Sequence, residues 1–166
     1  MFAVWFVFDK ENNKYLSDII KHLSIKYHSS NFIPHITAYG LVDVELDVMD
    51  KIVANSMKNE KSFIVEKTNI SYSDDFWKTL FIEIYPNDQL TIISKRLTKS
   101  LMSFGKYELK PHVSLVYKEM NLNEKKKLVK TLNIKNSFKI SGMCIVQFSE
   151  DIEKWKIVRE YILDLF

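Results

Sequence analysis

The chain uses very little glycine, proline and cysteine: its 166 residues include three glycines, three prolines and one cysteine. A single cysteine excludes an intramolecular disulfide and weakly indicates a reducing compartment. So little glycine and proline argues against disorder, collagen-like repeats and long flexible linkers. The positions at which these scarce residues occur are therefore informative.

Long hydrophobic runs are also missing. The opening segment MFAVWFVFDKE has a short apolar stretch with no basic region before it, which does not fit a secretory signal peptide. No later apolar stretch is long enough to cross a bilayer as a helix. We therefore expect a cytoplasmic protein that has no membrane partner.

Neither sign of charge is in large excess, and the formal net charge is +3. This value permits an anionic ligand, but a dedicated nucleic-acid binder usually shows a basic stripe. The densest basic run, Lys125 to Lys127 with Lys130, has helical spacing and is predicted to form a solvated helix face. The apolar and charged fractions, 46% and 27%, are those of an ordinary globular protein. We predict a monomer with a single domain over residues 1–166.

Histidine is scarce too, yet two of the four histidines occur in one repeated phrase. The phrase is proline, histidine, an aliphatic residue and a hydroxyl residue, found as PHIT within residues 32–40 and as PHVS within residues 109–118. From this composition one such phrase arises by chance on the order of a few thousandths of a time per chain. Two copies almost half the chain apart therefore indicate a duplicated element. His22 and His28 have no such companion, and we expect them on the surface.

The hydrophobic pattern predicts a repeat of structural order around the two phrases. After a first strand, the expected order is helix, phrase strand, helix, strand and strand, and the same order then occurs again. The expected strands span residues 2–8, 32–39, 62–73, 78–85, 111–117, 137–148 and 154–163, and the expected helices begin at Asp9, near Leu46, at Pro86 and at Asn123. This order predicts an α+β fold of two duplicated lobes, whose mainly antiparallel sheets face each other across a central cleft with helices outside.

The phrase places an imidazole beside a hydroxyl. Because side chains alternate along a strand, His35, Thr37 and Tyr39 are expected on one face, and His112 and Ser114 share a face in the second copy. Two imidazoles suit a reaction in which one proton is removed and another is delivered near neutral pH. The hydroxyls can donate hydrogen bonds to an anion whose charge grows in the transition state. A phosphodiester fits this design, and no metal or cofactor is predicted, because the histidines lack companions at ligand spacing.

These residues resemble the signature of the 2H phosphoesterases, in which two H-x-[ST] phrases lie on strands of a duplicated α+β fold. Within that superfamily the chain is most similar to the plant and yeast cyclic phosphodiesterases, and the likeness extends through AVWFVFDKE, DFWKTLFIEIY and EKWKIVREYIL. The resemblance implies the bilobal 2H fold. It also implies metal-independent hydrolysis of cyclic phosphates to phosphomonoesters, with 2′,3′-cyclic nucleotides, ADP-ribose 1″,2″-cyclic phosphate or RNA 2′,3′-cyclic ends as substrates.

The resemblance also implies roles for individual residues. His35 and His112 match the acid/base pair, and Thr37 and Ser114 match the phosphate-binding hydroxyls. The weaker candidates for substrate binding are all aromatic: Tyr117, Tyr39, Trp5 and Phe76. In a regular strand Tyr117 would lie on the face opposite His112, so its role requires a bend or bulge. Tyr117 and Trp5 also fit a purely structural place in the core.

Other functions stay open at this point. A 2′-5′ phosphodiesterase or a ligase-like RNA-end enzyme of the same superfamily uses the same four residues, but the modest charge does not favour the basic groove that a polynucleotide needs. A non-catalytic nucleotide- or RNA-binding module is a third possibility, although binding alone does not require a proton-transfer pair. The expected partner is a small nucleotide cyclic phosphate or an RNA terminus.

Overall fold

The computed structural model describes residues 1–164, and its element order agrees with the predicted order. The strands are β1 (Phe2–Phe8), β2 (Ile36–Val42), β3 (Phe63–Tyr72), β4 (Leu80–Ile84), β5 (His112–Val116), β6 (Ser137–Gln147) and β7 (Lys156–Ile162). The helices are α1 (Lys10–Tyr27), α2 (Leu46–Ser56), α3 (Asp88–Leu101) and α4 (Leu122–Thr131), with short 3₁₀ helices η1 (Phe76–Lys78) and η2 (Ile152–Lys154). Residues 165 and 166, which the single-domain prediction includes, lie outside the described residues.

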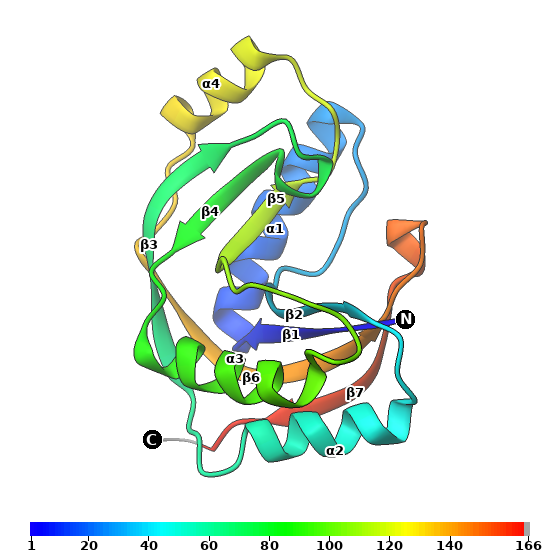
Figure 1. The fold of residues 1–166 in the computed structure, drawn as a ribbon. Coiled ribbons are helices and arrows are strands. Elements are labelled where there is room, and N and C mark those ends of the chain that lie inside the picture. Colours follow the sequence, from blue (N-terminus) through cyan, green and yellow to red (C-terminus); the bar gives the residue numbers. More distant parts are fainter. Residues whose placement is uncertain (165–166) are drawn as a thin grey trace.

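The strands form one strongly bent antiparallel sheet in the order β2-β1-β6-β3-β4-β5, with β7 paired to β6 (Figure 1). Strand β3 belongs to both halves of this sheet: residues 63–66 pair with β6, and residues from Lys67 to Tyr72 pair with β4. The predicted α+β fold with mainly antiparallel pairing is confirmed. Its two halves are joined through one long strand, so by pairing they are a single sheet.

The halves of the sheet are not the halves of the sequence. The β6–β7 pair follows the second phrase in the chain but joins β1, next to the first-phrase strand β2. The β3–β4 pair follows the first phrase but joins the second-phrase strand β5. The two halves of the sheet have therefore exchanged these strand pairs relative to the sequence order. Local patterns specify where strands occur, whereas strand partners depend on which apolar faces can be buried together.

Side-chain caps define where the helices begin. Asp9 accepts a hydrogen bond from the Asn12 backbone N–H at 2.9 Å, and Asn87 accepts one from the Leu90 N–H at 3.0 Å, as the sequence predicts. Helix α4 begins earlier than expected, because its cap is Asn121, which accepts from the Glu124 N–H at 2.9 Å.

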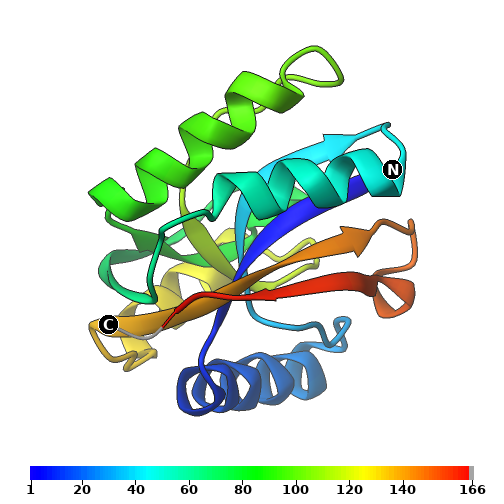
Figure 2. The same cartoon turned by 90° about the horizontal axis from the view of Figure 1, so that it is seen from below.

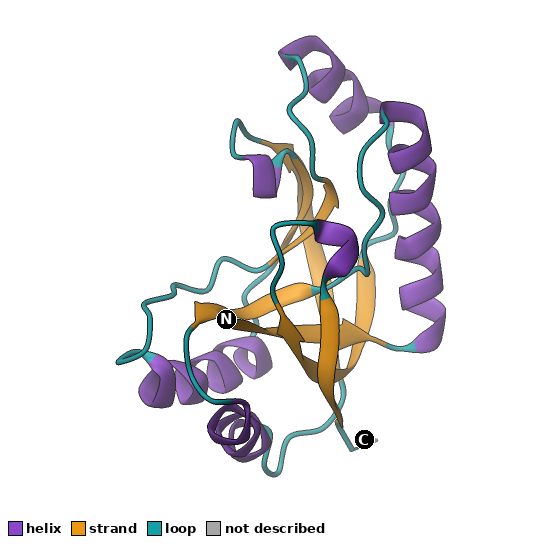
Figure 3. Ribbon diagram, turned by 90° about the vertical axis from the view of Figure 1, so that its right-hand side faces the viewer, coloured by secondary structure: helices purple, strands orange, loops and turns teal. Residues whose placement is uncertain are grey.

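The helices lie outside the strands (Figure 3), with α2 and α3 on one side of the sheet and α1 on the other (Figure 2). Strand β1 is buried on both faces, which explains its continuous apolar run. Val4, Phe6 and Phe8 belong to the main core, whereas Trp5 packs on the opposite face with the buried thiol of Cys144. Among residues 1–164 no helix is long and apolar enough to span a membrane.

Candidate active site

One cavity receives residues from both phrases. Its volume is about 320 Å³, at the lower end of the range of roughly 300–1,000 Å³ for small-molecule sites. It is lined by Ala3, Trp5, His35, Thr37, Gly40, Leu41, Asp75, Trp77, Lys78, Tyr107, His112, Tyr117, Val146, Phe148 and Trp155. Apolar and aromatic side chains thus surround a few polar groups, an arrangement typical of sites that bind small organic ligands.

The two imidazoles are oriented by the same local device. Nδ1 of His35 lies 2.7 Å from the carbonyl oxygen of Ile33, and Nδ1 of His112 lies 2.7 Å from that of Lys110. A carbonyl oxygen only accepts hydrogen bonds, so Nδ1 must carry the proton and donate it. In each neutral ring the Nε2 lone pair is then free to take up a proton. The proline between acceptor and histidine restricts the backbone of this turn in both copies.

His35 is held in a largely dehydrated place. Its ring stacks flat on the indole of Trp5, with centroids 3.5 Å apart and an interplanar angle of 7°. The residue is only 7% exposed. Burial lowers the pKa of His35 to about 3, the hydrogen bond to Ile33 opposes this effect, and the charge of His112 lowers the pKa further. His35 is therefore neutral throughout the physiological range.

His112 has a more open and more charged environment. It is partly exposed, and its ring meets the edge of Phe81 at a centroid distance of 5.6 Å. Burial lowers the pKa of His112 below its ordinary value of 6.5, and the bond to Lys110 opposes this. Lys78 also lowers that pKa, whereas Asp75 raises it.

The two hydroxyls differ. Thr37 lines the cavity, and its hydroxyl has no hydrogen-bond partner within the described part of the chain. Ser114 is 5% exposed, and its Oγ donates to the Trp77 carbonyl at 2.8 Å. Ser114 is also absent from the residues that line the cavity. Its single proton is used inside the protein, so the two hydroxyls, equivalent in sequence, differ in their hydrogen bonding.

A β-bulge in β2 moves Tyr39 away from the cavity. Trp5 pairs with Thr37, but the preceding residue of β1 pairs with Tyr39, which leaves Ala38 as the extra residue. The bulge reverses the alternation of faces beyond it. Tyr39 is fully buried in the core, and its hydroxyl donates to the Gly105 carbonyl at 2.7 Å. The prediction that Tyr39 shares a face with Thr37 and contacts substrate is therefore wrong.

The second phrase strand has a bulge at the equivalent position. Phe81 pairs with Ser114 and the preceding residue of β4 pairs with Val116, which leaves Leu115 as the extra residue of β5. This bulge turns Tyr117 toward the cavity, which it lines. The bend that the sequence required for Tyr117 is thus present, and burial raises the pKa of its hydroxyl, which stays protonated as a hydrogen-bond donor.

Gly40 and Tyr117 are equivalent in the two copies, because each lies three residues after its hydroxyl residue. Both line the cavity. A Cβ at residue 40 would lie 2.8 Å from Cδ2 of Tyr107, so the missing side chain makes room for this ring. The Tyr107 hydroxyl donates to the Thr37 carbonyl at 3.3 Å. Each copy thus presents a tyrosine to the cavity: Tyr117 directly follows β5, whereas Tyr107 comes from the segment between α3 and β5.

Indole rings that the sequence reading missed form much of the wall. Trp77 and Trp155 stack with centroids 5.7 Å apart and an angle of 26°, and Tyr117 meets both rings edge-on. The predicted Phe76 lies behind this wall: it is 39% exposed, stacks on Tyr117 and does not line the cavity. From the sequence, Phe76 is expected at the cavity. Because residues 76–78 form the short 3₁₀ helix η1, the neighbouring Trp77 faces the cavity instead.

The structure therefore brings together most of the predicted residues. His35, His112, Thr37, Tyr117 and Trp5 line one cavity, whereas Ser114, Tyr39 and Phe76 do not. The residues missed from sequence that also line it are Ala3, Gly40, Leu41, Asp75, Trp77, Lys78, Tyr107, Val146, Phe148 and Trp155. Two signals were available for some of them: an aromatic next to Phe76, and one of the chain's three glycines directly after the first phrase.

No cluster of three or more histidine, cysteine, aspartate or glutamate side chains suited to a metal ion is found among residues 1–164. The charged groups that line the cavity are Asp75 and Lys78. Any anionic ligand in the described cavity therefore meets one ammonium group and the two imidazoles.

Comparison with solved structures identifies the fold. The protein TT0787 of Thermus thermophilus superposes with a TM-score of 0.70 at 10% identity, covering 99% of this chain and 98% of that one. LigT of E. coli complexed with 3′-AMP gives a TM-score of 0.65 at 11% identity, covering 98% and 97% of the two chains. At such low identities the likeness concerns the fold alone.

Comparison of sequences identifies the family. A curated relative from Arabidopsis thaliana named "Cyclic phosphodiesterase" is 19% identical over 126 residues, which cover 76% of this chain and 70% of that protein. The family model described as "Cyclic phosphodiesterase-like protein" matches residues 1–163, nearly the whole chain. The chain therefore belongs to the cyclic phosphodiesterase-like family of 2H phosphoesterases.

Proposed function

We propose that this protein hydrolyses cyclic phosphodiesters of small nucleotides to phosphomonoesters without a metal ion, with His35 and His112 as the acid/base pair. The observation that carries this proposal is the pair of imidazoles lining one cavity, each with Nδ1–H bonded to a carbonyl and Nε2 free. A binding module does not need this matched tautomer, whereas proton transfer at phosphorus does.

The proposed reaction moves two protons. Nε2 of the base imidazole accepts a proton from water while the water oxygen forms a bond to phosphorus. The bond between phosphorus and one ribose oxygen breaks, and Nε2–H of the other imidazole, which starts protonated, donates its proton to that oxygen. The product is a phosphomonoester with a free neighbouring hydroxyl, and the two histidines end in exchanged protonation states.

The environments of the two rings favour a division of roles. Because its pKa is about 3, His35 is neutral at working pH and its Nε2 is available to accept a proton, so we assign it as the base. Burial and Lys78 lower the pKa of His112, but the bond to Lys110 and the charge of Asp75 oppose this, and the ring is more exposed than that of His35; of the two imidazoles it therefore suits the acid. A bound phosphate raises the pKa of both rings because it stabilises the imidazolium form.

Phosphate and nucleoside would bind to different parts of the cavity. The free hydroxyl of Thr37 and the ammonium of Lys78 suit the non-bridging phosphate oxygens, and Ser114 can join them once its hydroxyl rotates away from the Trp77 carbonyl. The ring faces of Trp77 and Tyr117 suit a nucleobase. LigT, which shares the fold, has been crystallised with 3′-AMP, a nucleoside phosphomonoester.

The alternative of a 2′-5′ phosphodiesterase or RNA-end enzyme is less well supported. A polynucleotide backbone needs a row of cations, but Lys78 is the sole lysine or arginine among the described residues that line the cavity. A volume of about 320 Å³ also favours a mononucleotide-sized ligand.

The test is hydrolysis of a 2′,3′-cyclic nucleotide in excess EDTA, with the product identified by phosphorus NMR. The wild type is compared with His35→Ala and with His22→Ala, a matched control because His22 is exposed on α1, outside the cavity. We expect chelator-resistant opening to one phosphomonoester isomer, lost in His35→Ala and retained in His22→Ala.

Failure has two distinct forms. Activity that disappears with EDTA and returns with a divalent ion would contradict the metal-independent mechanism. No turnover of any cyclic mononucleotide by the folded wild type, with turnover of 2′-5′-linked oligonucleotides or RNA ends, would replace the proposed substrate class.

A further inference from the structure

Lys125 is buried, although it belongs to the lysine run that the sequence predicts to be solvated. It is 3% exposed, whereas Lys126 and Lys127 are exposed. It also lies in the first turn of α4, where the helix dipole disfavours a cation. Burying an ammonium group costs free energy unless its donors are satisfied. A lysine at this position therefore depends on specific contacts.

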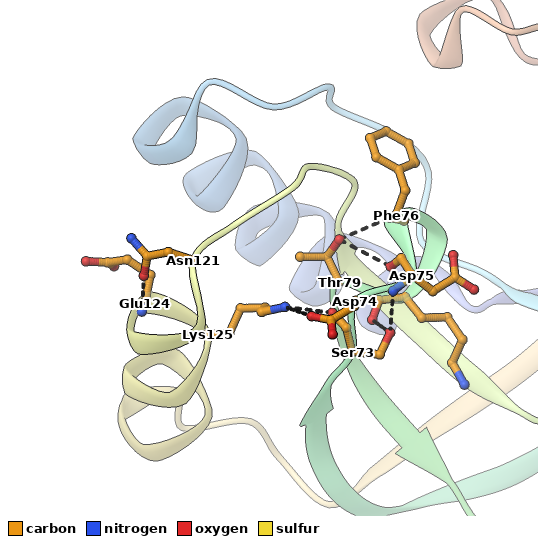
Figure 4. Close-up of polar contacts among 9 residues, drawn as sticks. Ser73, Asp74, Asp75, Phe76, Thr79, Asn121, Glu124 and Lys125 are labelled. Carbon is orange, nitrogen blue, oxygen red and sulfur yellow. Dashed lines mark hydrogen bonds and ion pairs between the residues drawn. The ribbon is translucent and has the colours of Figure 1, made fainter.

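Those contacts join α4 to the end of β3. The Lys125 ammonium donates to the Ser73 carbonyl and to the Asp74 carboxylate, both at 2.9 Å (Figure 4). It also lies 5.7 Å from the ring centroid of Tyr72. The Asp74 side chain is fully exposed, so the Ser73 carbonyl is the partner that compensates burial. The Lys125 ammonium thus links α4 to the main chain of Ser73, which lies 52 residues earlier in the sequence.

The segment that Lys125 contacts is tied together internally. The Ser73 hydroxyl donates to the Lys78 carbonyl at 2.6 Å, and the Ser73 N–H donates to the Thr79 carbonyl at 3.2 Å. Asp75 accepts from the Trp77 N–H at 2.9 Å. Residues 73–79 therefore form a closed loop between the paired residues Tyr72 and Leu80. It is anchored to α4 through Ser73 and to β5 through the bond from the Ser114 hydroxyl to the Trp77 carbonyl.

This loop separates two cavities. On one side Asp75, Trp77 and Lys78 line the cavity that contains His112. The other side borders a second cavity of about 270 Å³, lined by Ser73, Asp74, Phe76, Thr79, Glu119, Met120 and Lys125. The space behind the loop gives it room to withdraw from His112 when its bonds to Lys125 or Ser114 are lost, so the position of the loop depends on these anchor contacts.

We infer that Lys125 is a positioning residue of the phosphodiesterase site: its ammonium holds the 73–79 loop against the cavity, and so holds Lys78, Asp75 and Trp77 near His112. The inference rests on the proposed function for the catalytic meaning of His112. The placement itself can be tested without turnover.

The titration of His112 reports the position of the loop. The charged and titratable groups that share its cavity, pair with it or contact it are Lys78, Asp75, His35, Tyr107, Tyr117, Glu83 and Lys110. Lys78 and Asp75 belong to the loop, and of these Lys78 has the larger effect, lowering the pKa of His112. Withdrawal of the loop would remove this effect and hydrate the ring, and both changes raise the pKa of His112. His35 is buried against Trp5, outside the loop, so its pKa should not change.

The experiment compares Lys125→Met with Lys126→Met, which removes the same charge from the neighbouring exposed position. Imidazole signals are followed by NMR against pH and assigned with His35→Ala and His112→Ala. In Lys125→Met we expect the pKa of His112 to rise by roughly 0.5 unit or more, with that of His35 unchanged. We also expect faster amide exchange within residues 73–79 and a fall in kcat/KM of roughly 10- to 100-fold. Lys126→Met should match the wild type.

A folded Lys125→Met whose His112 titrates as in Lys126→Met would overturn the inference. Equal shifts at His35 and His112 would also overturn it, because they would indicate general loosening. If Lys125→Met does not fold, Lys125→Gln decides by the same criteria, because its amide retains a donor but loses the charge and the reach. If the wild type turns over no cyclic phosphate, the proposed function fails while the selective shift of His112 still tests the placement.

Discussion

In the PHIT region the imidazole of His35 lies flat on Trp5 and is almost fully buried, whereas in the PHVS region the imidazole of His112 makes a T-shaped contact with Phe81 and is partly exposed. Their backbones are nearly the same: each ring donates Nδ1–H to a carbonyl two residues earlier, and each strand has a bulge after its hydroxyl residue. Local sequence thus sets the tautomer, and the elements packed against each ring set its pKa. The two motifs are nearly identical in sequence, but their imidazoles differ in environment and in the causes that shift their pKa values.

The hydroxyls and tyrosines extend the comparison. Thr37 has a free hydroxyl, whereas that of Ser114 is bonded to the Trp77 carbonyl. In the PHVS copy, Tyr117 directly follows the strand and lines the cavity. In the PHIT copy the equivalent residue is Gly40, which leaves room for the ring of Tyr107. Each difference comes from a neighbouring segment, and each can be tested by changing one member of an equivalent pair.

The largest expected effect is loss of either imidazole. His35→Ala and His112→Ala should each lower kcat by roughly 10²–10⁴-fold, the usual contribution of a positioned acid or base. A p-nitrophenyl phosphodiester separates their roles, because its leaving group needs no proton. If His112 is the acid, His112→Ala should lose much less activity on this ester than on the cyclic substrate, while His35→Ala loses as much on both. The reverse pattern would exchange the two assignments.

The second largest effect is expected from removal of the hydroxyl groups, and it should differ between Thr37 and Ser114. Thr37→Val should lower kcat/KM by about 10²-fold, because a free donor to the phosphate is lost. Ser114→Ala should cost only about 10-fold, since its proton already binds a protein carbonyl. Thr37→Ser is the matched control and should keep most of the activity. Equal losses in Thr37→Val and Ser114→Ala would mean that Ser114 rotates to bind phosphate as fully as Thr37 does.

The pH dependence should show both lowered pKa values. The base must be neutral, so activity falls as pH drops toward the pKa of His35, about 3. The acid must be protonated, so activity also falls as pH rises above the pKa of His112, which lies below 6.5. The kcat/KM profile should therefore be a bell with its optimum on the acid side of pH 6.5. At pH 8 it should be roughly 30-fold or more below its maximum.

The profile of kcat provides the internal control for this prediction. Bound substrate phosphate raises the pKa of both rings, so the kcat bell should lie at higher pH than the kcat/KM bell. Profiles that are flat through neutrality, or a kcat/KM optimum above pH 7, would contradict acid/base work by these two groups.

The smallest effect is expected at Gly40. In Gly40→Ala the new Cβ would lie 2.8 Å from the Tyr107 ring, which must shift. We expect a loss of about 1 kcal/mol in the free energy of unfolding, measured by urea denaturation, and a change of only a few-fold in KM. In the double variant with Tyr107→Ala the ring is absent, so its cost should be smaller than the sum of the two single costs. Strict additivity would show that Gly40 is not needed for the packing of Tyr107.

Much of the fold could be predicted from the chain because its signals are local. The caps Asp9 and Asn87, the apolar run of β1 and the helical stripes require only neighbouring residues. The pairing of the strands was not predictable in this way, because β6 pairs with β1, which lies near the other end of the chain, and β7 in turn pairs with β6. The burial of Lys125 has the same cause, because its compensating partner Ser73 lies in a distant turn.

The amino-acid sequence by itself determined the two imidazoles, their hydroxyl neighbours and the family, because the PHIT and PHVS phrases act through bonds within a few residues. Tertiary structure alone decided that Tyr39 enters the core, that Trp77 replaces Phe76 in the wall and that Ser114 binds the Trp77 carbonyl. It also decided that the pKa of His35 falls to about 3. The physical reason is that a bulge, a short 3₁₀ turn or a stacked indole changes what faces a side chain, and desolvation and hydrogen bonding depend on those neighbours in space.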